Sequence, residues 1–99
     1  KGFDLKLLEK IKNKCNIPLL AHGGGGSNDD ILNLFKKLDL NGCVLSSCLH
    51  YYYINKIPKA KIQSMGGSEY INKLNSEKFN FEGIKNLKKY LNENGIKVR

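Results

Sequence analysis

Two short apolar runs, separated by one segment of helical length, constrain the fold of this chain more than any other feature. The runs are Pro18–Ala21 and Cys43–Ser46, and neither alternates apolar with polar residues. Strands without that alternation are typical of parallel sheets that are covered on both faces. Because the distance from Ile17 to Cys43 suits one strand–helix–strand crossover, we predict an α/β fold in which the two strands are parallel neighbours.

Apolar residues at helical spacing predict one helix before the first strand and another between the strands. The first helix begins at Asp4, a suitable N-cap, and ends near Lys14. The second begins at a capping arrangement of Ser27 and Asp30 and ends near Asp39. The side chains predicted to face the core are Leu5, Leu8 and Ile11 in the first helix and Ile31, Leu34, Phe35 and Leu38 in the second.

The rest of the chain is predicted to be a long connection followed by a last helix. No periodic pattern persists from Leu49 to Asn80, and one short helix is expected near 69–74. The last helix takes Asn80 as its N-cap and ends at Asn94 and Gly95, where glycine suits the left-handed position after a helix. Its predicted inward residues are Ile84, Leu87, Tyr90 and Leu91.

Two buried parallel strands cannot form a stable sheet by themselves. Each would keep an unpaired hydrogen-bonding edge, and the predicted helices would cover too little apolar surface. The chain also begins without an initiating methionine. We therefore expect it to be a piece of a longer chain, or a fragment that associates.

The composition is that of a globular protein with a basic surface. The 99 residues contain no apolar run long enough to cross a bilayer and no secretory signal, so we expect a cytoplasmic protein without a membrane partner. Three unpaired cysteines predict reduced thiols, and Cys43, Cys48, His50 and His22 lack the spacing of a zinc site, so no metal is expected. The net charge of +8 comes almost entirely from lysines on predicted outer faces, which favours a nucleic-acid partner only weakly.

A run of four glycines follows the first predicted strand, and a pair of serines ends the second. Unhindered backbone N–H groups at the carboxyl end of a strand can cradle an anion, and the N-terminus of the following helix adds to the attraction. Parallel neighbours would place the glycines and serines side by side, as in barrels that bind phosphate after their last two strands. The sequence therefore predicts a phosphate site formed by Gly23, Gly24, Gly25, Ser46 and Ser47.

Plainer interpretations of these residues stay open. The glycines could form a flexible turn, and the serines could cap the next segment. His22 lies between the strand and the glycines, where it could contact the phosphate or its substrate, or be structural. Asp29 and Asp30 would repel a phosphate if they pointed inward, so we expect them to face solvent.

Four segments carry a resemblance to a known family. They are GFDLKLLEKI from Gly2, IPLLAHGGGGS from Ile17, GCVLSSCLHY from Gly42 and the final GIKNLKKYLNENGIKVR. In order and spacing they resemble the carboxyl-terminal part of the cyclase subunit of imidazole glycerol phosphate synthase, and more broadly the phosphate-binding barrels of histidine biosynthesis. The resemblance covers most of the chain apart from the long connection.

The resemblance implies that residues 1–99 form one partial domain, the carboxyl-terminal portion of a (βα)8 TIM barrel in the order α-β-α-β-insertion-α. Gly24, Ser46 and Ser47 match positions that hold a substrate phosphate. The family's catalytic aspartates lie on strands that this chain lacks, so no catalytic residue is assigned here and the fragment alone is expected to be inactive. The full-length parent would be a lyase without a cofactor, which uses ammonia from a glutaminase partner on a phosphorylated ribulotide.

Two departures from the family pattern leave the substrate open. His22 stands where the family commonly has a small residue, and residues 52–78 are predicted to be an inserted loop on the substrate face. One alternative is a related barrel that assists amidation of a surface-polysaccharide sugar. Another, of a different class, is a small basic module that binds nucleic acid through its lysines and the run Tyr51–Tyr53.

Overall fold

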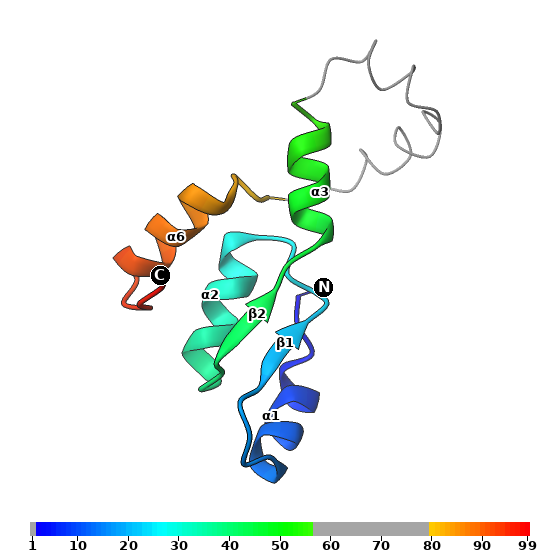
Figure 1. Cartoon of the computed structure of the whole chain (residues 1–99), viewed down its shortest axis with the longest axis vertical. Helices are drawn as coiled ribbons and strands as arrows, with labels where there is room; N and C mark the ends of the chain where they lie inside the picture. The colour runs from blue at the N-terminus through cyan, green and yellow to red at the C-terminus, as the bar shows by residue number, and fades with distance from the viewer. Residues whose placement is uncertain (1, 57–79) are drawn as a thin grey trace, which may run out of the picture.

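A computed structural model describes residues 2–56 and 80–99 of the chain. Within them the order of elements is α1 (Leu5–Lys14), β1 (Leu20–His22), α2 (Asn28–Lys37), β2 (Gly42–Val44), α3 (Ser47–Ile54) and α6 (Ile84–Glu93). β1 and β2 pair in parallel, with Ala21 opposite Cys43. The predicted pair of parallel strands joined by a helix is therefore confirmed (Figure 1).

The core lies largely between α2 and α6. Ile31 and Leu34 of α2 are completely buried, and Leu87 and Leu91 of α6 pack into the same apolar cluster. Ile31 and Leu34 are three residues apart, and Leu87 and Leu91 are four apart, so each pair lies on one face of its helix. Figure 1 shows the two helices side by side, as their contacts also require.

The first two helices begin at the predicted caps. The carboxylate of Asp4 accepts the N–H of Leu7 at 3.0 Å, and the hydroxyl of Ser27 accepts the N–H of Asp30 at 3.1 Å. Each bond satisfies a backbone N–H group that the first turn of a helix leaves unpaired.

The last helix begins later than predicted. Its N-cap is Gly83 rather than Asn80, and Gly83 has a φ of +96°. A Cβ atom at position 83 would lie 2.9 Å from the ring of Tyr52, so the close approach of this ring requires glycine there. Asn80 instead forms an isolated parallel bridge with Ser27.

The end of the last helix follows the prediction. Asn94 is the C-cap and Gly95 has a φ of +86°. The N–H of Ile96 donates to the carbonyl of Leu91 at 2.9 Å, which is the bond expected when glycine follows a helix.

α3 occupies positions where the sequence predicted the start of a long connection. Residues 52–54 of the predicted insertion are helical, whereas residues 57–78 lie outside the described part of the chain, as does the helix predicted near 69–74. Apolar and aromatic side chains occupy nearly every position of α3. Because they surround the helix rather than forming a stripe, no helical period was visible.

The strands are less covered than the sequence predicted. Leu20 of β1 is 59% exposed and Val44 of β2 is 46% exposed. Leu7 and Ile11 of α1 are exposed as well, although Ile11 was predicted to face the core. Among the described residues each strand has a single partner, so both outer edges of the sheet present unpaired backbone groups.

A hydrogen bond joins α2 to α6 beside their apolar contact. The hydroxyl of Tyr90 donates to Oδ1 of Asp29. This bond, more than burial or the charge of Asp29, raises the pKa of the Tyr90 phenol above its ordinary value. The folded state therefore favours the neutral phenol. The contact stabilises the fold at pH values below the ordinary tyrosine pKa, and this stabilisation is lost as the pH rises through the raised pKa of Tyr90.

We expect Tyr90→Phe to lower the free energy of unfolding at pH 7, and the difference from the unaltered chain to shrink above about pH 10, where tyrosine ionises. Urea unfolding at several pH values measures that difference. Tyr53→Phe, at an exposed tyrosine of α3, is the control and should show no such change with pH. A difference for Tyr90→Phe that stays constant from pH 7 to above pH 10 would contradict the role of the phenolic proton.

Candidate functional site

The carboxyl ends of β1 and β2 open into a single cavity of about 230 Å³. Figure 1 shows both strand arrows pointing toward the end of the sheet at which α3 begins. Parallel pairing places the loops after both strands at this end. The cavity brings together every residue that the sequence singled out for ligand contact: His22, Gly23, Gly24, Gly25, Ser46 and Ser47.

The glycine loop packs closely against the start of the chain. Gly23 and Gly24 have φ values of +88° and +106°, in the left-handed region. A Cβ atom on Gly24 would lie 2.6 Å from the carbonyl carbon of Gly2 and 2.9 Å from Cα of Phe3. On Gly25 it would lie 2.9 Å from the ring of Phe3. Glycine is therefore needed here so that the loop can pack against the chain's own backbone, and it also leaves the loop open to a ligand.

Two backbone donors of this loop are free. The N–H of Gly26 is used by the carbonyl of Gly24 at 3.1 Å and by Oδ2 of Asp30 at 3.2 Å. Within the described residues, the N–H groups of Gly24 and Gly25 have no acceptor. They are available to a bound anion.

The serine pair at the start of α3 also lines the cavity. Ser46 is the N-cap of α3, as the capping interpretation required, yet its hydroxyl makes no capping hydrogen bond. Both serine side chains are exposed. Their hydroxyls are therefore available to a ligand at the N-terminus of this helix.

Of the two acidic residues in the first turn of α2, one lies where predicted and the other does not. Asp29 is exposed and accepts the hydroxyl of Tyr90. Asp30 is half-buried and lines the cavity, so the expectation that it faces solvent is wrong. The cause is the hydrogen bond from the N–H of Gly26, which draws the carboxylate back over the start of the helix.

Sequence reasoning also missed Gly2, which forms part of the cavity wall. Only the folded chain brings this residue, twenty-two positions before Gly24, under the glycine loop, so no local pattern could have found it. For Asp30 a signal did exist. In the capping arrangement with Ser27, the acidic residue reaches back past the N-terminus of its helix, which is where the cavity lies.

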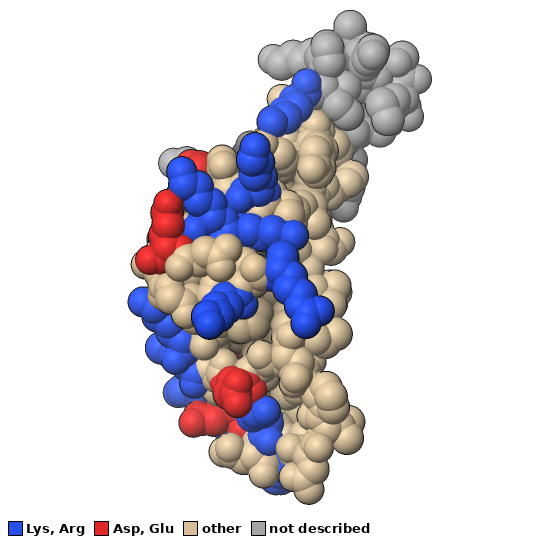
Figure 2. Space-filling model, turned by 60° about the vertical axis from the view of Figure 1, so that its left-hand side comes forward, with Lys and Arg blue, Asp and Glu red and all other residues tan. Residues whose placement is uncertain are grey.

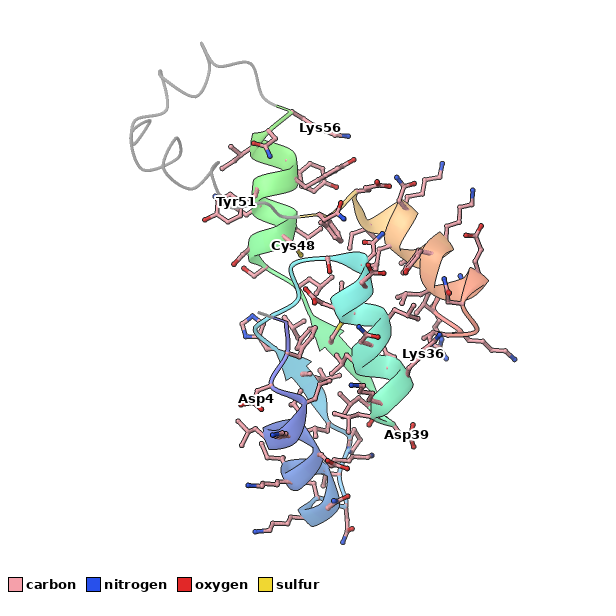
Figure 3. The ribbon with its side chains drawn as sticks, turned by 180° about the vertical axis from the view of Figure 1, so that it is seen from behind. Asp4, Lys36, Asp39, Cys48, Tyr51 and Lys56 are labelled. Carbon is pink, nitrogen blue, oxygen red and sulfur yellow. The ribbon has the colours of Figure 1, made fainter. Side chains whose placement is uncertain are left out.

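The cysteines lie outside this cavity. All three are free, and Figure 3 shows Cys48 at the end of α3 that is nearer the sheet. Burial raises the pKa of the Cys43 and Cys48 thiols, and the neighbouring Cys48 adds to the effect on Cys43. Protonated thiols are weak nucleophiles and weak metal ligands. In residues 2–56 and 80–99, no group of three His, Cys, Asp or Glu side chains is arranged to hold a metal ion.

A family model described as "Histidine biosynthesis protein" matches residues 1–55, more than half of the chain. The chain belongs to the histidine biosynthesis protein family. The matched residues run from the start of the chain through α3, so they include every residue that lines the cavity. The family resemblance stated from the sequence is thus confirmed.

Proteins similar to this chain include imidazole glycerol phosphate synthase subunits HisF. The subunit of Pseudoalteromonas translucida (strain TAC 125) is 43% identical over 54 residues, which cover 54% of this chain and 21% of the relative. The subunits of Yersinia enterocolitica and Yersinia pseudotuberculosis (strain IP 31758) are 29% and 30% identical over 98 residues, which cover 99% of this chain and 27% of each relative. No solved structure matches the chain. This member of the histidine biosynthesis protein family therefore spans about a quarter of the length of the curated relatives it matches.

None of the helices described for this family member is long and apolar enough to cross a membrane.

The contact of the glycine loop with the start of the chain predicts unequal effects at neighbouring glycines. Gly24→Ala adds a collision with the backbone of Gly2 and Phe3, whereas a Cβ atom on Gly23 would meet nothing within 4 Å. Both substitutions strain a positive φ, so Gly23→Ala is the matched control. We expect Gly24→Ala to lower the free energy of unfolding in urea by about 1–3 kcal/mol more than Gly23→Ala does. Equal losses would show that the loop does not press against the start of the chain.

Proposed function

We propose that this chain supplies the phosphate-binding end of a cyclase-like subunit of imidazole glycerol phosphate synthase. The observation that carries the proposal is the single cavity in which the glycine loop after β1 and the serines after β2 meet. The choice of enzyme rests on the similarity to HisF subunits. The binding of a phosphate is inferred from the free hydrogen-bond donors around the cavity.

We also propose that the complete protein is a (βα)8 barrel. Leu20 and Val44 stay exposed on a sheet whose two outer edges are unpaired in the described chain. Further parallel strands on both sides would satisfy these edges and cover the apolar side chains. The matched part is only 21–27% of each relative, so the relatives contain additional residues that could supply these strands.

The proposed phosphate is held by backbone and hydroxyl groups rather than by lysine. The cavity is lined by no Lys or Arg residue among those described. Figure 2 shows many Lys and Arg side chains on the face that this view brings forward. The exposed lysines of α6 are Lys85, Lys88 and Lys89, and none of them lines the cavity. Hydrogen bonds to a charged phosphate contribute about 1.5–3 kcal/mol each, so four or five free donors suffice for a specific site.

Ammonia from a glutaminase partner and a phosphorylated ribulotide would meet on the complete barrel. The family resemblance assigns the acid and base groups to aspartates outside these 99 residues, so the role proposed for this chain is to hold and orient the phosphate. His22 is exposed at the rim of the same cavity, where its imidazole can reach the rest of a phosphorylated substrate.

The alternative of a nucleic-acid-binding module is less well supported. Tyr52 is half-buried, with its ring 5.9 Å from that of Phe81 and with Nζ of Lys56 above it at 4.3 Å from the ring centroid. The ring is therefore already engaged within the fold. The run Tyr51–Tyr53 does not form one open platform on which bases could stack.

Phosphate binding can be tested by amide hydrogen exchange of the full chain. We expect added phosphate to slow exchange at Gly24 and Gly25, because their N–H groups become hydrogen-bonded. Gly95, which ends α6 and does not line the cavity, is the internal control and should be unaffected. Exchange rates at Gly24 and Gly25 that are equal with and without phosphate would refute the site.

Ser47→Ala tests the contribution of the hydroxyl groups. It should weaken phosphate binding about tenfold, since one hydrogen bond to a charged group is lost. The dissociation constant can be measured by NMR titration. Undiminished affinity would place the phosphate away from the serine pair.

A further inference from the structure

Asp30 brings a negative charge into the cavity for which we have proposed an anionic ligand. Its Oδ2 accepts the N–H of Gly26 at 3.2 Å. Its Oδ1 lies on the side of Gly2, 3.1 Å from the position a Cβ atom would take there. The side chain is half-buried between the glycine loop and the start of the chain.

Two hydrogen bonds hold Asp30 in this position. Its own N–H donates to the hydroxyl of Ser27, which anchors its backbone in the first turn of α2. Its carboxylate then reaches beyond the N-cap to the residue before it, Gly26, instead of to the N–H of Ser27 that an acidic residue at this spacing commonly takes. The carboxylate therefore shapes the glycine loop as well as capping the helix.

No side chain of permanent positive charge offsets Asp30 within the cavity. Apart from Asp30, the described lining residues are glycines, serines, apolar residues and His22. A carboxylate repels a nearby phosphate, and the repulsion is strongest where few opposite charges and little solvent screen it. The same carboxylate occupies the Gly26 N–H, so one donor of the loop is withdrawn from the ligand.

We propose that Asp30 is a specificity-determining residue of this cavity: it keeps the glycine loop in shape and lowers its affinity for dianions relative to monoanions. The inference rests on the proposed phosphate site. It concerns the charge that the site accepts, and it follows from the position of one carboxylate rather than from the family resemblance.

Asp30→Asn tests the proposal, because asparagine keeps an oxygen acceptor for Gly26 and removes the charge. The probes are methyl phosphate, a dianion at pH 8, and dimethyl phosphate, a monoanion, each titrated into the full chain and followed by NMR. We expect Asp30→Asn to tighten binding of methyl phosphate about fivefold and to change binding of dimethyl phosphate less. Asp29→Asn removes the same charge from the same helical turn outside the cavity, and it should change either affinity less than about twofold.

An unchanged or weaker affinity of Asp30→Asn for methyl phosphate would overturn the proposal, and so would an equal gain for Asp29→Asn. If neither the unaltered chain nor the variants bind either probe, the phosphate site itself fails and this inference fails with it. The unaltered chain gives a further measurement that needs no substitution. Methyl phosphate should shift the amide resonances of Gly24 and Gly25 more than that of Gly26, whose N–H is already taken, and an equal or larger shift at Gly26 would overturn the proposal.

Discussion

The parallel pairing of β1 with β2 is the interaction on which the rest of this structure depends. Parallel strands send their carboxyl ends to the same edge of a sheet, so the loops that follow them have to meet. The register that sets Ala21 opposite Cys43 brings His22 and the glycines level with the serines at the start of α3. In an antiparallel pair the same residues would lie at opposite ends, and no common cavity would exist.

The glycine run serves this arrangement in two ways. Facing the cavity, it offers backbone donors with no side chain in front of them. Facing the other way, it leaves room for Gly2 and Phe3 to pass directly beneath the loop. The entropy lost by ordering four glycines is thus offset by packing within the protein, and a ligand need not supply all of it.

Local signals predicted the parts of this structure that local physics controls. Asp4 and Ser27 begin their helices where the sequence predicted, because each side chain accepts a backbone N–H of its own first turn. Gly95 follows the last helix as predicted, because glycine readily adopts the left-handed conformation needed there. The predicted site residues also converge on one cavity, because the crossover connection determines which strand ends meet. The approach of the start of the chain to Gly24 is a tertiary contact that no local pattern specifies. The bond between Asp30 and Gly26 spans four residues and belongs to the capping arrangement that the sequence already indicated. The cap at Gly83 was missed because it depends on the approach of the Tyr52 ring from another helix. α3 was missed because apolar and aromatic side chains occupy nearly every position and show no helical period.

The contact between Tyr52 and the start of α6 has a consequence for how this chain could diversify. The ring of Tyr52 lies against Gly83 and Phe81, so the polypeptide re-enters the described fold next to the place where it leaves it. When the two ends of a connection are held together, doubling its length costs only about 0.6 kcal/mol of closure entropy. Segments of very different size can therefore be exchanged at this point without moving the strands, which makes it a natural place for related proteins to differ in length.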